Sequence, residues 1–397
     1  MKIVDCKTFV VGNPPPAFGG RYFIFVKLTT DDGISGIGEV YSIPFDPHIV
    51  AKMIEDVAER YLIGSDPHHI ESFWRKAHGT AYTLRPDVTM MGIVSGLEMA
   101  CWDIVGKAAD KPIYELMGGR VHETLRSYTY IYPNSAKGES DAIYKNAELS
   151  AERAAEYVAM GFSAVKFDPV APYSAFDPRQ PSQAELALAE KFCRLIREAV
   201  GGKADLLFGT HGQFTVSGAV RLAKVLEPWD PLWFEEPTPP EMPEMMAEVA
   251  RKTTVPISTG ERLATKYEFQ RVLAHGAASI IQFDLGRVGG LLEAKKIASM
   301  AETYYAQIAP HCYCGPVVGA ANIQISACSP NFLILESIQT WGGFYAELLK
   351  KPIQWQDGYV IPPTEPGLGV ELNEAVALAH PYSGKSLHLE MTNRPVG

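Results

Sequence analysis

The pattern of hydrophobic and polar positions changes near residue 126. Beyond this point, short apolar runs alternate with longer stretches in which apolar residues recur every three or four positions. Strands are predicted at 127–132, 164–169, 205–208, 232–235, 257–260, 279–283, 307–310 and 332–336. Helices are predicted between them at 150–160, 182–200, 217–226, 244–252, 266–274, 290–304 and 317–327. Residues 126–345 are therefore predicted to form an α/β domain, a modified (β/α)7β TIM-type barrel.

The first 125 residues follow a different pattern. Strand-like segments at 22–28 and 35–40 flank a turn, and apolar residues of 94–108 fall on one helical face. Residues 1–125 are therefore expected to form an α+β capping domain. No regular helix follows the last barrel strand, whereas 358–361 resembles a strand. We expect the segment 346–397 to leave the barrel and return to the capping domain.

Composition narrows the class of protein. The 397 residues include 46 Asp and Glu against 36 Lys and Arg, and this net charge of −10 disfavours nucleic-acid partners and acidic membranes. No uninterrupted apolar run reaches the roughly 20 residues that cross a bilayer, and no signal-peptide core follows Met1. The six cysteines lack disulfide spacing, and Cys312 and Cys314 lack a second pair of zinc ligands. We expect a cytoplasmic protein.

Charged residues stand at the ends of the predicted barrel strands. The C-terminal ends of parallel barrel strands meet at one mouth, where barrel enzymes carry their active sites. Burying this much polarity without a purpose would be costly. The sequence therefore predicts an enzyme whose site includes Lys166, Glu235, Glu261, Asp284, His311 and Glu336.

Glu235 and Glu261 end neighbouring strands and are predicted to bind a metal ion. Two carboxylates placed close together repel each other unless a cation lies between them, and oxygen ligands on a rigid scaffold suit Mg²⁺. The alternative is that Glu235 or Glu236 only caps a helix or pairs with Arg262.

A second group is predicted to transfer protons. Asp284 and His311 end adjacent strands, so the carboxylate could orient the imidazole and raise its pKa. Lys166 lies across the mouth and is a second acid/base candidate, with an electrostatic contact to a substrate carboxylate as the alternative. Glu336 either hydrogen-bonds the substrate or only closes the barrel.

Several motifs together resemble one family. They are 100–104 with Gly106 and Lys107, 116–119, 233–237, Gly260 with Glu261, Asp284 followed by Gly289 and Gly290, and His311. The chain resembles the mandelate racemase subgroup of the enolase superfamily over nearly its whole length, and especially its acid-sugar dehydratases, related to mannonate and galactarate dehydratases. The resemblance implies that the Glu residues bind Mg²⁺ and that the His–Asp dyad is an acid/base catalyst.

Two positions depart from the family's pattern. The family usually has Lys-x-Lys on the second barrel strand, where this chain has Lys166-Phe167-Asp168, and it has a metal-binding Asp on the third strand, where this chain has Gly209. We expect Asp168 to supply the third metal ligand, because Mg²⁺ prefers its oxygen to the imidazole of His211. His211 as the ligand, or no replacement, remains open.

Loop residues complete the expected site. Tyr173 follows the second barrel strand, and the resemblance to mannonate-type enzymes makes it a second candidate base, with simple packing as the alternative. Arg21 and Arg85 of the capping domain, with His211 and Gln213, are expected to bind substrate.

The resemblance implies removal of the proton α to a carboxylate and loss of the β-hydroxyl, giving a 2-keto-3-deoxy acid. A galactarate-like diacid is the favoured substrate, and we expect a homo-oligomer. The same first step would serve an epimerase, racemase or cycloisomerase. A non-catalytic sugar-acid-binding protein with a degraded metal site is the alternative from another class, supported by Gly209.

Overall fold

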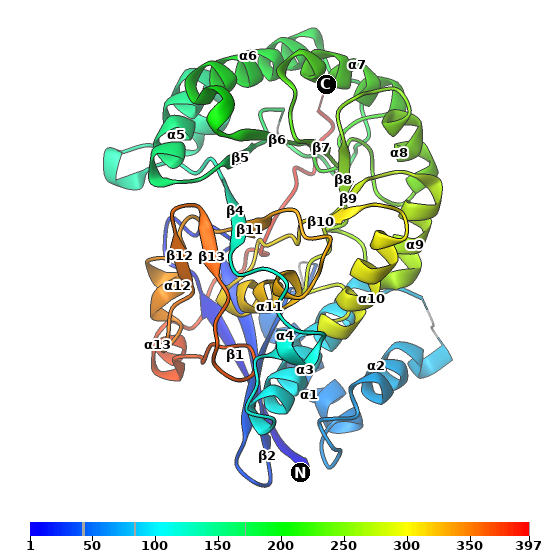
Figure 1. Ribbon diagram of the computed structural model, residues 1–397, viewed down its shortest axis with the longest axis vertical. Coiled ribbons are helices and arrows are strands. Elements are labelled where there is room, and N and C mark those ends of the chain that lie inside the picture. The colour runs from blue at the N-terminus through cyan, green and yellow to red at the C-terminus, as the bar shows by residue number, and fades with distance from the viewer. Residues whose placement is uncertain (42–43, 83–84, 171, 397) are drawn as a thin grey trace.

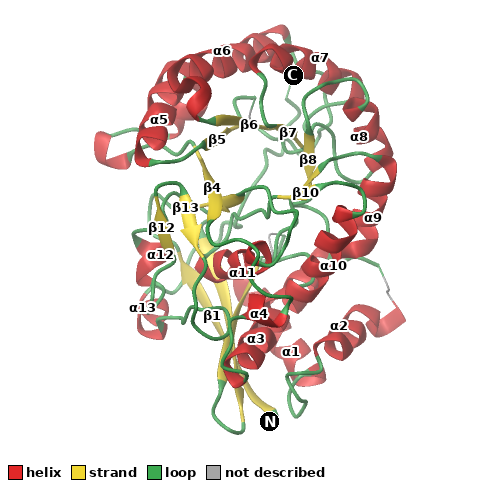
Figure 2. Ribbon diagram, viewed as in Figure 1, coloured by secondary structure: helices red, strands yellow, loops and turns green. Residues whose placement is uncertain are grey.

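The computed structural model describes residues 1–41, 44–82, 85–170 and 172–396. Figure 1 shows two parts: a ring of helices around a set of short strands, and a smaller unit of strands and helices beside it. Figure 2 shows that the strands of the ring lie inside and the helices outside. This arrangement is that of a barrel with an attached α+β domain, so the predicted fold class is confirmed.

Eight parallel strands form the barrel in the described part of the chain. Seven of them pair side by side from β4 to β10, and β11 pairs with β4. An isolated parallel bridge between Ile308 and Phe332 joins β10 to the segment before β11. The strands are β4 (Leu125–Tyr130), β5 (Ala164–Phe167), β6 (Asp205–Gly209), β7 (Trp233–Glu235), β8 (Ile257–Thr259), β9 (Ile280–Ile281), β10 (Gln307–Ile308) and β11 (Leu335–Ser337).

Seven helices alternate with these described strands and cover the barrel. Side-chain caps from Asn146, Ser182 and Thr215 begin three of them. Ser182 accepts from the Glu185 amide while the Glu185 side chain accepts from the Ser182 amide, which starts α6. The helices are α5 (Ala147–Met160), α6 (Gln183–Val200), α7 (Val216–Leu226), α8 (Pro243–Ala250), α9 (Thr265–His275), α10 (Leu291–Glu302) and α11 (Pro316–Ala327). Each begins within three residues of its predicted start.

The capping unit is built on three antiparallel strands, β1 (Ile3–Gly12), β2 (Tyr22–Thr30) and β3 (Ser35–Val40). Helices α1 (Pro47–Tyr61), α2 (Ile70–Gly79), α3 (Val88–Ala108) and α4 (Ile113–Leu116) accompany them. Helix α3 begins six residues earlier than predicted, because the Asp87 side chain accepts hydrogen bonds from the amides of Thr89 and Met90.

Helix α3 is the one described helix that is long and apolar enough to cross a membrane, but most of it is buried inside the protein. It packs closely on β3 because both lack side chains at the contact. A side-chain carbon at Gly38 would lie only 1.8 Å from the Gly96 carbonyl oxygen. These glycines therefore let helix and strand approach backbone to backbone.

Two buried carboxylates of the capping unit tie it to the barrel. Glu39 accepts hydrogen bonds from the amides of Gly315 and Val318 at the start of α11. Glu98 accepts from Leu291 and Leu292 at the start of α10. Each carboxylate satisfies amides at a helix N-terminus that would otherwise lack partners, and so fixes the capping unit over the barrel.

The chain leaves the barrel after β11. It forms α12 (Phe344–Glu347), β12 (Gln354–Gln356), β13 (Tyr359–Ile361) and α13 (Glu374–Ala379). Strand β13 pairs antiparallel with β4, and Pro381 forms a bridge with Val11 of β1. The C-terminal segment, red in Figure 1, then crosses toward the barrel.

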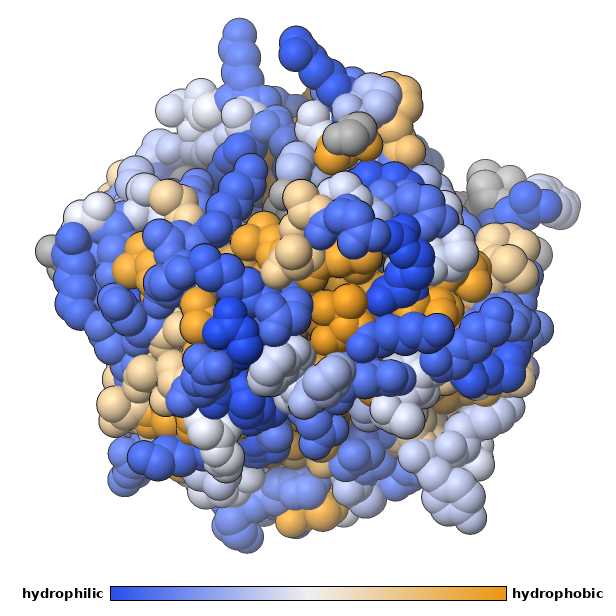
Figure 3. Space-filling model, turned by 90° about the horizontal axis from the view of Figure 1, so that it is seen from above, coloured by the Kyte–Doolittle hydropathy of each residue, from blue (hydrophilic) through white to orange (hydrophobic). Residues whose placement is uncertain are grey.

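Seen from above, the surface carries hydrophilic side chains with scattered apolar patches among them (Figure 3).

Candidate active site

The barrel interior is organised in layers. Apolar residues from seven strands or their extensions meet in its centre: Tyr128, Ala164, Leu207, Trp233, Ile280, Ala309 and Ile334. Because side chains alternate along a strand, the residue two positions later also points inward, one layer closer to the mouth. That layer holds Tyr130, Lys166, Gly209, Glu235, Gln282, His311 and Glu336. The site is therefore the polar layer above an apolar floor.

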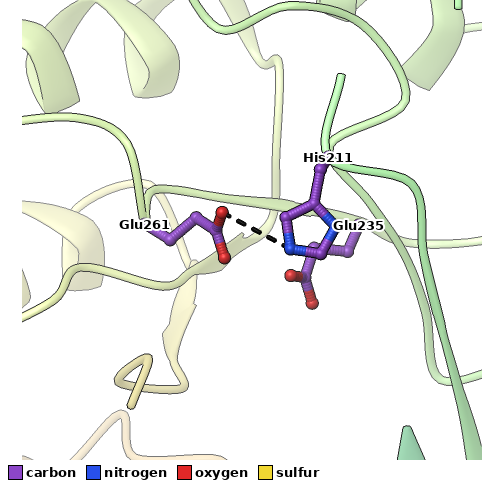
Figure 4. Close-up of side chains that lie close together, drawn as sticks. All are labelled: His211, Glu235 and Glu261. Carbon is purple, nitrogen blue, oxygen red and sulfur yellow. Dashed lines mark ion pairs between the residues drawn. The ribbon is translucent and has the colours of Figure 1, made fainter. Parts of the chain in front are cut away.

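Three side chains of this region could hold a metal ion. Ligand atoms of His211, Glu235 and Glu261 all lie within 4.8 Å of one another. Figure 4 shows the three side chains pointing toward a common space, with Nε2 of His211 lying 3.6 Å from Oε1 of Glu261. Glu235 is held by Lys166 at 2.6 Å and by the Gln282 amide at 2.9 Å. The predicted pair of glutamates is thus close together, and His211 completes the group.

Asp168 lies behind His211. Its Oδ2 is 3.0 Å from Nδ1 of His211, and its Oδ1 is buried without a hydrogen-bond partner among the described residues. A side-chain carbon added at Gly209 would lie 2.0 Å from that Oδ1. The Asp168 carboxylate therefore reaches into the space that a residue with a side chain at 209 would need.

The His211 imidazole is held by acidic neighbours. Burial alone would lower its pKa, but the carboxylates of Glu261 and Asp168 outweigh burial and raise the pKa of His211 to about 9. Nδ1 of His211 faces the Asp168 carboxylate at ion-pair distance, without a regular hydrogen bond among the described residues. The other ring nitrogen, Nε2, faces the two glutamates.

His311 and Asp284 form the predicted dyad. Nδ1 of His311 lies 2.6 Å from Oδ2 of Asp284, whose Oδ1 accepts from the Gly286 amide at 2.7 Å. The other ring nitrogen, Nε2, lies 3.1 Å from Oε2 of Glu261. Burial lowers the pKa of His311, but Glu261 and Asp284 more than offset it and hold the pKa well above its usual value. The geometry suits an imidazole that exchanges a proton through Nε2.

Lys166 lies among acidic groups. Its Nζ is 2.6 Å from Oε1 of Glu235 and 3.9 Å from Oε1 of Glu336. Burial lowers the pKa of Lys166, yet these two carboxylates raise it well above its usual value. Glu336 also accepts from the Cys312 amide at 2.8 Å. These neighbouring carboxylates keep Lys166 protonated when no metal ion is bound, so Lys166 is a cation rather than a base.

Tyr173 donates its hydroxyl hydrogen bond to Oδ2 of Asp168, and its ring centroid lies 4.4 Å from that of His211. Burial and the Asp168 charge both raise the pKa of Tyr173 well above its usual value. A phenolate beside this carboxylate would be unfavourable, so the contact favours Tyr173 as a proton donor that holds Asp168 in place.

The structure does not bring the other expected binding residues into the cavity. Arg21 is partly exposed and pairs with Glu390, and Arg85 lies at a separate hollow over α1 and α3. Gln213 is buried and donates to the carbonyls of Val170 and Pro172, so it supports the loop after β5.

Of the two consecutive glutamates, Glu236 and not Glu235 pairs with Arg262. Arg262 donates to Oε2 of Glu236 at 2.8 Å, while Glu235 points into the polar layer. Glu235 is the last residue of β7, whereas Glu236 lies just beyond it with φ +43°. The two side chains therefore take different directions, one to Lys166 in the site and the other to Arg262.

The polar layer opens into a cavity of about 230 Å³. Its walls are Tyr41, Tyr130, Tyr132, Tyr144, Lys166, Asp168, Tyr173, His211, Glu261, His311, Tyr313, Glu336 and Leu389. Sequence reasoning missed five of the six tyrosines and Leu389. Tyr130 and Tyr132 could have been found, because they end the first predicted barrel strand. Tyr41 and Leu389 come from segments whose approach to the mouth has no local signal.

The donor set fits a divalent cation. Five buried carboxylates converge here, Asp168, Glu235, Glu261, Asp284 and Glu336. These negative charges would outnumber the positive ones even if Lys166 and the imidazoles of His211 and His311 were all protonated. Oε2 of Glu261 faces Nε2 of His311 at 3.1 Å without a regular hydrogen bond, and Oδ1 of Asp168 is buried without a hydrogen-bond partner among the described residues. A cation would supply the missing charge and coordinate such oxygens.

Comparisons with known proteins agree with this geometry. Residues 149–376 match the enolase C-terminal domain-like family, and residues 17–118 match the N-terminal domain of mandelate racemase and muconate lactonizing enzyme. Curated relatives include the D-galactonate dehydratases of Pectobacterium atrosepticum and Ralstonia nicotianae, 33% and 34% identical, each alignment covering 95% of this chain and 94% of the relative.

A solved structure from Labrenzia alexandrii, assigned to the mandelate racemase/muconate lactonizing enzyme group, is 64% identical. It superposes with a TM-score of 0.97 and covers 100% of this chain and 99% of its own. The predicted resemblance and the prediction of an enzyme are confirmed. The chain belongs to the mandelate racemase/muconate lactonizing enzyme family of the enolase superfamily.

Proposed function

We propose that the protein is a dehydratase of a sugar acid, a carbon–oxygen hydro-lyase that works with a divalent cation. The observation that carries this proposal is that a metal-type group, His211 with Glu235 and Glu261, lies beside the His311–Asp284 dyad, with His211, Glu261 and His311 lining one cavity. Relatives across the full length are named D-galactonate dehydratase, which supports the same reaction class. The product would be a 2-keto-3-deoxy acid.

Glu235, Glu261 and His211 are the proposed metal ligands. Asp168, the third ligand favoured by the sequence, is proposed instead to orient His211 through Nδ1. Mg²⁺ is the expected cation, although an imidazole in the set also suits Mn²⁺. A divalent cation there would stabilise charge developing on the substrate carboxylate and would relieve His311 of the Glu261 charge that holds its proton.

His311 is proposed to take the α-proton. Asp284 holds its Nδ1, so Nε2 is the atom that faces the cavity and receives the proton. Lys166 is proposed to bind the substrate carboxylate as a cation, since Glu235 and Glu336 hold its proton. Positioned acid/base groups of this kind contribute about 10²–10⁴-fold to a rate.

The cavity walls favour a sugar acid with a single carboxylate. Lys166, the cation of the described cavity lining, lies beside the metal-type group and can pair with one substrate carboxylate. Tyrosines and Leu389 form much of the remainder, and no arginine is found among the described lining residues. A second carboxylate would lack a partner there, whereas tyrosine hydroxyls can bind sugar hydroxyls. The residues that line the cavity therefore do not support the preference for a galactarate-like diacid that the sequence suggested.

The proposal is tested with purified protein, Mg²⁺ or Mn²⁺, and a panel of five- and six-carbon aldonic and aldaric acids. Semicarbazide detects a 2-keto-3-deoxy product. We expect turnover of at least one aldonic acid, and none by Glu261→Gln, which keeps the shape but removes the ligand charge. Turnover of a diacid in preference would restore the original substrate hypothesis.

The other reactions would be recognised by their products. A racemase, epimerase or cycloisomerase would exchange the α-proton with solvent deuterium or invert a centre without forming a semicarbazone. A non-catalytic binder would show calorimetric binding of an acid sugar without either change. The close approach of Glu235, Glu261, Asp284 and His311 to one another favours catalysis over the binder.

A further inference from the structure

The last residues of the chain return to the mouth of the barrel. Residues 386–394, here called the strap, follow the bridge of Pro381 with the capping sheet and run toward the loop after β5. Figure 1 shows this red segment passing from the capping unit to the side of α6 and α7. The family match ends at residue 376, so the strap lies beyond it.

The strap is anchored to the capping unit and to the loop after β10. His388 is buried, and its ring nitrogens lie 2.9 Å from the Tyr22 carbonyl and 2.8 Å from the Tyr313 carbonyl. Gly20, at φ +117°, leaves space for this ring, because a side-chain carbon there would lie 1.9 Å from it. Arg21 adds contacts to the Leu387 carbonyl at 2.8 Å and to Glu390 at 3.0 Å.

The far end of the strap pairs with the barrel loop that carries Tyr173. The Thr392 amide donates to the Tyr173 carbonyl at 2.9 Å, and the Ala175 amide donates to the Thr392 carbonyl at 3.0 Å. Ser174 donates from its hydroxyl to the Arg394 carbonyl at 2.8 Å. The strap therefore holds the backbone of the residue whose hydroxyl contacts Asp168.

Leu389 lies between these two anchors and forms part of the cavity wall. Its neighbours in the sequence, His388 and Glu390, are both held by the capping unit, so its position is fixed from that side. Tyr132, Tyr144 and Tyr313 line the same cavity. An apolar side chain in this wall excludes volume and offers no hydrogen bond to a sugar hydroxyl.

We propose that the strap closes the active site and that Leu389 sets the length of the acid sugar that fits. The role of Leu389 in selecting substrate length rests on the proposed dehydratase function. Closure through backbone hydrogen bonds to the Tyr173 loop, with both ends anchored, makes the strap a wall of the site rather than a loose terminus.

Closure is tested without any substrate by hydrogen exchange in the full chain. Thr392→Pro removes the amide that bonds to Tyr173, while Thr392→Ala keeps it and serves as the matched control. We expect exchange at Ala175 to rise by about tenfold in the proline variant alone, as for loss of one hydrogen bond. Equal exchange in wild type and both variants would overturn closure by the strap.

Selectivity is tested with D-galactonate and a five-carbon aldonic acid. Leu389→Trp should lower kcat/KM for the longer acid relative to the shorter by about tenfold or more, and Leu389→Ala should shift the ratio the other way. Met391→Ala, at a partly exposed strap residue, is the control. An unchanged ratio in both Leu389 variants would overturn the selectivity role. If the wild type converts no acid of the panel, the proposed function fails, and hydrogen exchange still decides closure.

Discussion

The carboxylate of Asp168 occupies the space in which a side chain at residue 209 would begin. Oδ1 of Asp168 lies 2.0 Å from the position of a side-chain carbon on Gly209. Gly209 ends β6, pairs with Glu235 in the sheet and stands at the level of the polar layer. A neighbouring strand thus supplies a carboxylate where β6 has none, and its Oδ2 contacts His211.

Gly209→Ala should therefore displace Asp168 and weaken metal binding. Loss of a carboxylate that orients a metal-binding histidine typically costs 10–100-fold in affinity, and we expect a loss of about that size in calorimetric titration with Mg²⁺ and Mn²⁺. The double variant Asp168→Ala with Gly209→Asp returns a carboxylate from β6 and should recover most of the affinity. Wild-type affinity in Gly209→Ala would contradict this relationship.

Asp284→Asn tests the dyad. The asparagine keeps the size of the side chain but removes the charge that stabilises protonated His311, so proton transfer should slow. We expect kcat to fall by about 10²–10⁴-fold with the fold intact. Circular dichroism checks the fold, and semicarbazide assays give kcat. A loss confined to KM would argue that Asp284 only shapes the cavity.

Lys166→Met should destabilise the metal-free protein. The substitution leaves the buried Glu235 carboxylate without its ammonium partner, and removing one member of a buried ion pair costs about 3–5 kcal/mol. Urea denaturation measures the free energy of unfolding. Combining Lys166→Met with Glu235→Gln removes both charges and should recover much of the loss. Additive losses in the double variant would show that the two groups are not coupled.

Acid should loosen the strap. Burial lowers the pKa of His388 to about 4, against about 6.5 in the released segment. The docked form is therefore fully favoured above about pH 6.5, and up to about 3 kcal/mol of docking is lost as the pH falls toward 4. The groups around the ring are Tyr22, Tyr41, Tyr313, Arg287 and Asp284.

Hydrogen exchange at Ala175, corrected for the intrinsic rate, should be faster at pH 5 than at pH 7. His388→Gln cannot gain a proton, so the difference should shrink in that variant. The same pH dependence in both proteins would assign the effect to other groups.

Most of the barrel could be predicted from the sequence because its strands are short apolar runs and its helices are amphipathic. The same periodicity predicted that Lys166, Glu235 and His311 share one mouth, since parallel strands end there. Helix α3 shows a limit of this reasoning. Its start depends on the Asp87 cap, which lies outside the apolar pattern.

The third ligand and the outer wall could not be predicted in the same way. Whether Asp168 or His211 faces the glutamates depends on how two side chains from neighbouring elements share space beside Gly209. Leu389 reaches the cavity only because the chain end crosses back over the barrel, a contact between residues far apart in the sequence. Homo-oligomer formation and a cytoplasmic location stay predictions.

Proton NMR of one reaction in D₂O tests the central claim most directly. Wild-type protein with Mg²⁺ or Mn²⁺ is incubated with D-galactonate and the other aldonic acids of the panel. The account predicts a 2-keto-3-deoxy acid carrying one deuterium at C3, because the enol formed after loss of the α-proton and β-hydroxyl takes its new proton from solvent. Unchanged substrate throughout the panel, or deuterium at C2 with the β-hydroxyl retained, would contradict dehydration.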